Sequence, residues 1–267
     1  MRRIEDKIGR RVVSLYTSFV YPVIIDDGDA TILDGILQAM DLPSGLTLIL
    51  SSPGGSGVSA ERIINVCRVY SNGNFEVIVP GMAKSAATMI CLGAQSIMMS
   101  DTSELGPIDP QVFVVADGRE NYMPANVVIE SYETLLQEAV ATQGRIEPYL
   151  QLLSRFDPSE IRQFKEAQAL GEDIAKRALQ TGMMKAKGNQ VGGTVRFFSD
   201  PKRMKTHERP IFWKEAQTAG LAINHVDNRD DLWLLISDLH QRADFVVSTR
   251  YAKIIETCDQ EFGVQVP

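Results

Sequence analysis

Short apolar runs separated by helical patterns fill the first hundred residues, and this alternation constrains the fold more than any other feature of the sequence. The runs Leu46–Leu50 and Phe75–Val79 are continuous and apolar, which is typical of strands inside a parallel sheet. Arg11–Val20 and Ser96–Ser100 are also predicted to be strands, and residues 30–41 carry apolar side chains at helical spacing. Because strand, helix and strand follow one another closely, right-handed βαβ crossovers are expected. The sequence therefore predicts an α/β fold with a parallel βαβ core.

The rest of the chain is expected to add to this core within a single domain that spans residues 1–267. Residues 1–123 would form the α/β core, residues 124–187 an added helical segment, and residues 188–267 a return to the core with C-terminal helices. Helix-forming residues dominate positions 127–182, which predicts two or three helices packed beside the core.

Local patterns give more detail for the last part of the chain. The glycine-rich stretch Gly188–Gly193 is expected to be a flexible loop. A short helix is expected over Trp213–Ala219, and a longer one from about Asp230 to Arg242. The tail is expected to add a strand at Phe245–Val247 and a short helix after it.

Charge and composition exclude several classes of function. A net charge of -7 argues against general binding of nucleic acid, which usually needs a basic surface. No apolar stretch approaches the roughly 18 residues of a membrane span. The start, Met1–Lys7, carries positive charge but no long apolar run follows it, so it does not resemble a secretory signal. We therefore expect the protein to be cytoplasmic.

The cysteines and histidines do not form a metal-binding pattern. Cys67 and Cys91 lie in apolar helical patterns and are expected to be buried thiols, with Cys258 far from both. No Cys/His cluster has zinc spacing, and no Gly-x-x-x-x-Gly-Lys phosphate-binding loop occurs. Neither a metal nor a cofactor is expected.

Two turns, each at the end of a predicted strand, carry the residues best suited to chemistry. Ser85 lies in a run of small residues between an apolar strand and an apolar helix, where unpaired backbone N–H groups could face it. In the other turn, Gly54 and Gly55 allow unusual backbone angles and close approach of a ligand. Both turns would meet at the carboxyl edge of a parallel sheet, so N–H groups of Gly54 or Gly55 and of Ala86 could form an oxyanion hole beside the Ser85 hydroxyl. The alternative is structural: small residues let a buried helix approach the sheet closely.

Three motifs, in this order, resemble the serine dehydrogenase proteinase family. They are Ser51–Gly55, Gly81–Ala87 and Leu105–Gln111, with weaker resemblance at His207–Ile211 and from Glu215 to Leu221. That family belongs with the ClpP-class and signal-peptide-peptidase-type serine proteases of the ClpP/crotonase fold. The resemblance implies a ClpP/crotonase-like fold, with Ser85 as nucleophile and the N–H groups of Gly54 and Ala86 as the oxyanion hole.

The general base does not follow directly from this resemblance. A ClpP-type triad would have a histidine about 25 residues after the serine, where this chain has Asp109, and no lysine lies between Lys84 and Lys165 to complete a Ser-Lys dyad. Our hypothesis is that His207 accepts the serine proton while Asp109, or alternatively Glu208, orients or stabilises it, because imidazole is suited to this role at neutral pH. The structural alternatives are a surface-loop histidine and a turn acid between two prolines.

The leading function is a serine endopeptidase that cleaves peptide or protein substrates through an acyl-enzyme on Ser85. One alternative is a crotonase-like enzyme acting on an acyl-thioester, which would not need this serine. Another is a catalytically impaired scaffold that binds peptides or partner proteins. The resemblance also implies a homo-oligomer. Because the sequence contains no ATPase domain, any unfoldase would have to be a separate protein partner or adaptor.

Overall fold

The main sheet of the computed structural model has seven strands and is parallel at its centre. The structure describes residues 1–116, 119–204 and 206–266. Across the sheet the strands are ordered β10 (Ile223–His225), β5 (Ser96–Met99), β3 (Phe75–Val79), β2 (Leu46–Ser51), β1 (Arg11–Thr17), β11 (Tyr251–Glu256) and β12 (Glu261–Gln265). The pairs from β10 to β1 are all parallel, whereas β11 and β12 form an antiparallel hairpin at one edge. This confirms the predicted α/β fold.

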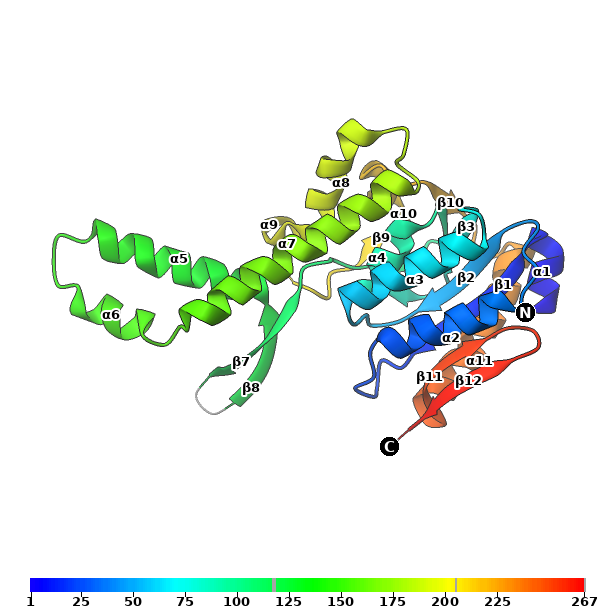
Figure 1. Cartoon of the computed structure of the whole chain (residues 1–267), viewed down its shortest axis with the longest axis horizontal. Helices are drawn as coiled ribbons and strands as arrows, with labels where there is room; N and C mark the ends of the chain where they lie inside the picture. Colours follow the sequence, from blue (N-terminus) through cyan, green and yellow to red (C-terminus); the bar gives the residue numbers. More distant parts are fainter. Residues whose placement is uncertain (117–118, 205, 267) are drawn as a thin grey trace.

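Helices cover both faces of the sheet (Figure 1). One face is covered by α2 (Asp27–Gln38), α3 (Gly57–Tyr70) and α4 (Ala86–Gly93), and the other by α1 (Arg2–Ile8) and α11 (Asp231–Thr249). Helix α7 (Pro158–Thr181) packs on α3 and α4, and α8 (Gly188–Ser199) packs on α7. Side chains of β1 alternate between these two layers: Val13 and Leu15 join the first core, and Val12 and Tyr16 the second. All four are fully or almost fully buried, so β1 is covered on both faces.

The predicted helical segment forms an arm beside this core (Figure 1). Helices α5 (Ala125–Ala141) and α6 (Glu147–Leu153) lie away from the sheet, and the long α7 runs back from them to the core. A third apolar cluster, which includes Ile129 and Ile161, holds the base of the arm together. The hairpin of β7 (Gln111–Ala116) and β8 (Arg119–Pro124) leads into the arm.

Short elements complete the fold. A small three-stranded sheet of β4 (Met82–Ala83), β6 (Glu104–Leu105) and β9 (Ile211–Phe212) lies beside the main one. The remaining short helices are α9 (Pro201–Met204) and α10 (Trp213–Thr218).

Two local predictions about the last part of the chain are wrong. Gly188–Gly193 is not a loop but the first half of α8, because Val191, Val195 and Phe198 form a stripe that packs on the core and outweighs the low helix propensity of glycine. Phe245–Val247 lies inside α11, whose buried face continues to Val247. The tail forms the β11–β12 hairpin, with no short helix within the described residues.

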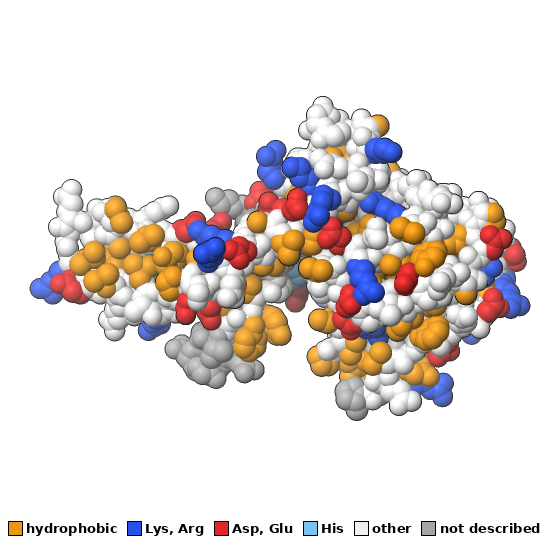
Figure 2. Space-filling view, viewed as in Figure 1, with side chains coloured by type: hydrophobic (Ala, Val, Ile, Leu, Met, Phe, Trp, Pro, Cys, Tyr) orange, Lys and Arg blue, Asp and Glu red, His pale blue; other side chains and the backbone are white. Residues whose placement is uncertain are grey.

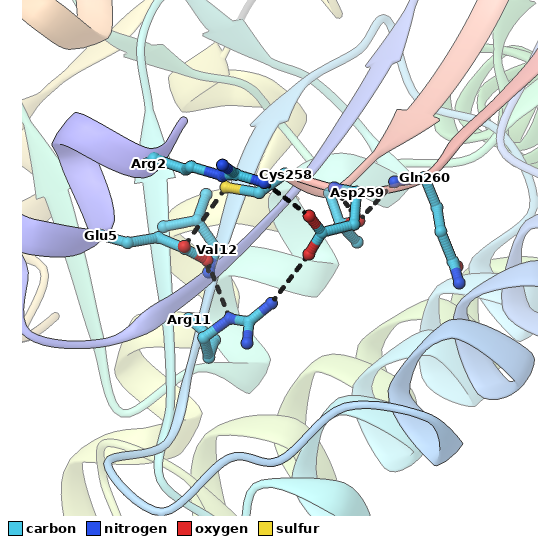
Figure 3. A network of polar contacts seen from close by, with 8 residues as sticks. Arg2, Glu5, Arg11, Val12, Cys258, Asp259 and Gln260 are labelled. Carbon is cyan, nitrogen blue, oxygen red and sulfur yellow. Dashed lines mark hydrogen bonds and ion pairs between the residues drawn. The ribbon is translucent and has the colours of Figure 1, made fainter.

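A polar network ties the first helix to the β11–β12 hairpin (Figure 3). The carboxylate of Glu5 accepts from the Val12 N–H at 2.8 Å and from the Arg11 guanidinium at 3.1 Å, and it contacts the Cys258 Sγ at 3.2 Å. Arg2 pairs with Asp259 at 2.8 Å. Cys67 and Cys91 are buried, as predicted, and burial raises the pKa of both thiols. In the described part of the chain, no helix combines the length and hydrophobicity needed to cross a membrane.

Candidate active site

Ser85 has a strained backbone at the start of a buried helix. It is the N-cap of α4 and has φ 51° and ψ −118°. Among the described residues the only other non-glycine residue with positive φ is Asn72, in a turn. Such a conformation costs about 1–3 kcal/mol, and residues held this way are concentrated at functional sites. The side chain of Ser85 is partly buried and lines a cavity.

Hydrogen bonds between the turn that carries Gly54 and Gly55 and the turn that carries Ser85 hold Ser85 in this geometry. The Ser52 N–H donates to the Met82 carbonyl at 3.0 Å, and the Lys84 N–H donates to the Ser52 carbonyl at 3.0 Å. On the other side of the turn, the buried Thr88 hydroxyl donates to the Ala83 carbonyl at 2.7 Å. Sequence reasoning gave no role to Ser52, although it lies in the motif Ser51–Gly55, and missed Thr88, which belongs to none of the motifs.

The two turns are close enough to present N–H groups to one bound group. A Cβ added to Gly54 would lie 2.7 Å from the Ser85 Cβ and 3.2 Å from the Ala86 nitrogen. The Gly54 N–H itself donates to the Ser52 Oγ at 3.1 Å. Within the described residues the N–H groups of Gly55 and Ala86 have no hydrogen-bond partner. Hydrogen bonding therefore leaves the N–H groups of Gly55 and Ala86, but not that of Gly54, available to a bound group.

Asp109 and His207 form a hydrogen-bonded pair although they are far apart in the sequence. The His207 Nδ1 lies 2.9 Å from the Asp109 Oδ1, and both side chains are largely buried. The loop after β6 carries Asp109, and bonds from the Ile108 N–H to the Phe198 carbonyl and from the Ala125 N–H to the Pro110 carbonyl fix it on both sides. His207 comes from the loop between α9 and β9.

Glu208, the alternative acid, lies outside this pair. Its side chain is exposed, and its carboxylate has no hydrogen bond or ion pair with any residue in the described ranges. Lys84 points away from Ser85, as expected: its Nζ is 2.7 Å from the Glu104 Oε2. The structure therefore brings Asp109, and not Glu208, to His207.

Ser85 and His207 line the same cavity, which has a volume of about 540 Å³. No hydrogen bond joins their side chains in the described structure, and such contacts are often loose in proteins without substrate. Gly54 and Gly55 line the cavity as well. The apolar part of the wall comes mainly from α4, α7 and the loop after β6, namely Met89, Ile108, Leu170, Gly171 and Ile174.

The other two histidines and the acidic groups do not form a second site of this kind. His225 stacks on Trp213 and its Nε2 lies 3.1 Å from Asp101. His240 packs on Tyr16. No group of three or more His, Cys, Asp or Glu side chains with the geometry of a metal site occurs among the residues described. A second cavity, of about 620 Å³, lies between α1 and α11 and contains neither Ser85 nor His207.

A parallel α/β sheet with a strained serine at a strand-to-helix turn, in a cavity that it shares with a glycine turn, has the architecture of a serine hydrolase site. The family model of ClpP-like SDH-type serine proteinases matches residues 3–148, more than half of the chain. The chain therefore belongs to the family of ClpP-like SDH-type serine proteinases. This confirms the resemblance found in the three sequence motifs.

The individual proteins that resemble this chain match it only over part of its length. Two uncharacterized proteins of Methanocaldococcus jannaschii, MJ1495 and MJ0137, are 29% identical over 142 residues and 35% identical over 101 residues. These matches cover 49% and 38% of this chain, and only 45% and 34% of the relatives, so less than half of either relative is spanned.

Among solved structures, a serine mutant of the 1510-N membrane-bound stomatin-specific protease has a TM-score of 0.41 and 16% identity, covering 85% of this chain and 82% of its own. A lysine mutant of the same protease, in complex with a substrate peptide, has a TM-score of 0.33 and 15% identity, covering 86% of this chain and 96% of its own.

Proposed function

We propose that the protein is a serine endopeptidase in which Ser85 forms the acyl-enzyme. The observation that supports this most is the strained backbone of Ser85 in a cavity that is also lined by Gly55 and by His207, whose Nδ1 is hydrogen-bonded to Asp109. A nucleophile, a base, an orienting acid and an oxyanion hole are the four parts that acyl transfer through serine requires.

In the proposed reaction the Ser85 Oγ attacks the scissile carbonyl while the His207 Nε2 accepts the hydroxyl proton. Asp109 accepts a hydrogen bond from the His207 Nδ1–H, which fixes the tautomer and stabilises the imidazolium. The oxyanion of the tetrahedral intermediate is bound by the N–H groups of Gly55 and Ala86. His207 returns the proton to the leaving amine, and water then hydrolyses the ester by the same route.

The cavity wall favours a substrate with a large apolar side chain next to the cleaved bond. Met89, Ile108 and Ile174 contribute apolar atoms to the wall, and among the described residues that line it the only titratable side chain besides His207 is the phenol of Tyr122. A charged side chain would lose hydration there without gaining a partner. Among fluorogenic peptides that differ only at this position, the peptide with leucine should therefore be cleaved faster than the peptide with aspartate.

The nucleophile is tested with a fluorophosphonate probe, which bonds to an activated serine Oγ with loss of fluoride. The wild-type protein should be labelled, and Ser85→Ala should not. Ser56→Ala is the matched control, because Ser56 lines the same cavity but caps α3 through the Ser59 N–H. It should cost about 1 kcal/mol of stability and keep the labelling. Labelling that survives in Ser85→Ala contradicts the proposal.

The base is tested separately. His207→Ala should lower peptide hydrolysis by orders of magnitude, and rates near those of the wild type would exclude it from the reaction. The scaffold alternative is supported by the absence of a hydrogen bond between the Ser85 and His207 side chains in the described structure. This alternative predicts peptide binding without labelling of Ser85. A crotonase-like enzyme would turn over acyl-thioesters in the Ser85→Ala variant as well as in the wild type.

We also propose that the protein is a cytoplasmic homo-oligomer assembled through its arm. Figure 2 shows hydrophobic side chains gathered on the arm, and the exposed ones include Leu136, Val140 and Leu150. Apolar surface of this kind often marks an interface. Light scattering should give a mass that is a multiple of 29.5 kDa, and a monomer would contradict this part of the proposal.

A further inference from the structure

A buried lysine lies behind the glycine turn that borders Ser85. Lys253 is on β11 and is paired in register with Thr17, the last residue of β1, so it reaches the carboxyl edge of the sheet. Its side chain is 4% exposed, and its Nζ lies 2.9 Å from both the Asp26 Oδ2 and the Asp29 Oδ2. The Asp29 side chain is 2% exposed. A buried lysine is rare unless it is paired, and this one is paired twice.

The Asp29 carboxylate binds both the buried lysine and one backbone peptide group. Asp26 is the N-cap of α2, and its N–H donates to the Asp29 Oδ2 at 2.9 Å. The same Oδ2 accepts from Lys253. The peptide unit between Ile25 and Asp26 is therefore fixed at its N–H end by a carboxylate that the buried lysine holds in place.

The other end of this peptide group contacts the glycine turn. The Ile25 carbonyl accepts from the Ser56 N–H at 2.9 Å, and the Ile25 N–H donates to the Gly54 carbonyl at 2.8 Å. Ile25 and Gly55 thus form an isolated parallel bridge, in which the N–H of Gly55 points away from Ile25. A Cβ on Gly55 would lie 2.3 Å from the Ile25 carbonyl oxygen, so the two backbones are in close contact.

We propose that Lys253 is a positioning residue for the oxyanion hole, because through Asp29 and the Ile25–Asp26 peptide it fixes the direction of the Gly55 N–H. This rests on the function proposed above. Lys253 does not touch the reacting atoms. It acts through a continuous path of hydrogen bonds from the ammonium to the Asp29 carboxylate, to the peptide group and to the Ser56 N–H beside Gly55.

The test uses three substitutions in the full chain. Lys253→Met removes the ammonium, Asp29→Ala removes the acceptor for the Asp26 N–H, and Asp29→Asn keeps an acceptor oxygen but not the charge. Arg10→Met is the control, since Arg10 is a largely buried cation that binds the Leu46 and Asn74 carbonyls at the opposite end of the strands. A general loss of stability would affect the control as well.

Two readouts separate this proposal from the proposed function. The first is the rate of fluorophosphonate labelling at Ser85, which should fall about 10- to 100-fold in Lys253→Met and Asp29→Ala, because a displacement of about 1 Å at a catalytic group has an effect of this size. Asp29→Asn should recover most of the rate, and Arg10→Met should keep it. Equal losses in Asp29→Asn and Asp29→Ala, or in the control, would overturn the positioning role.

The second readout is hydrogen exchange of the backbone N–H groups in residues 52–57, which needs no activity. Exchange there should become faster in Lys253→Met and Asp29→Ala and stay unchanged in Arg10→Met. Unchanged exchange in the first two overturns the inference even if labelling falls. If the wild-type protein is not labelled at all, the proposed function fails, and the exchange data alone decide whether Lys253 fixes the turn. If Lys253→Met does not fold, the comparison of Asp29→Ala with Asp29→Asn provides the test.

Discussion

Replacing Gly54 by alanine should damage both the stability of the protein and the site, because the structure leaves no room for a methyl group there. The added Cβ would lie 2.7 Å from the Lys84 carbonyl oxygen and 2.7 Å from the Ser85 Cβ. Ordinary contacts between carbon atoms are about 3.5–4.0 Å, so one of the two turns has to move by nearly 1 Å. The φ of +114° at Gly54 is also strained for any residue with a Cβ.

These two effects give the size of the expected change. The backbone strain is about 1–3 kcal/mol. Overpacking adds about 1–3 kcal/mol. Urea unfolding of Gly54→Ala should therefore show a loss of about 2–6 kcal/mol, a large part of the 5–15 kcal/mol typical of a folded domain. The folded fraction should also be labelled by fluorophosphonate far more slowly, since the Ser85 Cβ is one of the atoms displaced.

Gly193→Ala is the matched control for this prediction. Gly193 lies in the middle of α8, is exposed, and has no atom within 4 Å of an added Cβ. The substitution should stabilise the protein by about 0.5–1 kcal/mol through helix propensity and leave labelling unchanged. If Gly54→Ala changes the free energy of unfolding by less than about 0.5 kcal/mol and is labelled at the wild-type rate, the proposed contact between the two turns is refuted.

Three further predictions concern charged and titratable groups. Asp109→Asn should lower peptide hydrolysis by up to about 10⁴-fold without loss of fold, because an amide favours the wrong tautomer of His207; a rate within tenfold of the wild type excludes Asp109 as the orienting acid. Burial lowers the pKa of His240, so the unfolded chain binds a proton that the folded protein does not, and urea unfolding should show stability falling as the pH drops through about 6.5. His240→Gln should flatten this dependence, and an equal slope in both proteins would contradict it. Lys84→Met should be less stable because it breaks the pair with Glu104, yet it should keep fluorophosphonate labelling; complete loss of labelling in folded protein would instead point to a Ser-Lys dyad.

The fold of the first hundred residues was predictable because each strand is short, apolar and bounded by turn residues. Phe75–Val79 is a strand with the predicted ends, and the strand Leu46–Ser51 is one residue longer than predicted. Predictions failed where tertiary packing decides the structure. The glycines near the start of α8 indicate a loop locally, and only the core beneath them explains why they are helical. The division into one domain with three segments stays a prediction.

The candidate site was predictable only in part. Ser85 and the glycine turn were found because parallel strands bring their carboxyl ends to one edge, which depends only on the strands being parallel. The pairing of Asp109 with His207 was a hypothesis with Glu208 as alternative, since the direction of a side chain on a loop cannot be derived from spacing. Lys253 could not have been found at all: an isolated lysine in a strand looks solvent-exposed until the Asp26 and Asp29 carboxylates are seen to surround it.

The arm explains why Asp109 and His207 meet although almost a hundred residues separate them. After Asp109 the chain leaves the core through the β7–β8 hairpin, and α7 brings it back, with Gly171 of α7 placed so that an added Cβ would lie 3.5 Å from the Met89 Cε. Helix α8 then binds the Ile108 N–H through the Phe198 carbonyl, one residue before Asp109. The loop with His207 follows directly. The chain that closes the apolar wall with α7 thus continues through α8 to the proposed base, so the packing of α7 and α8 on the core places both the wall and the His207–Asp109 pair.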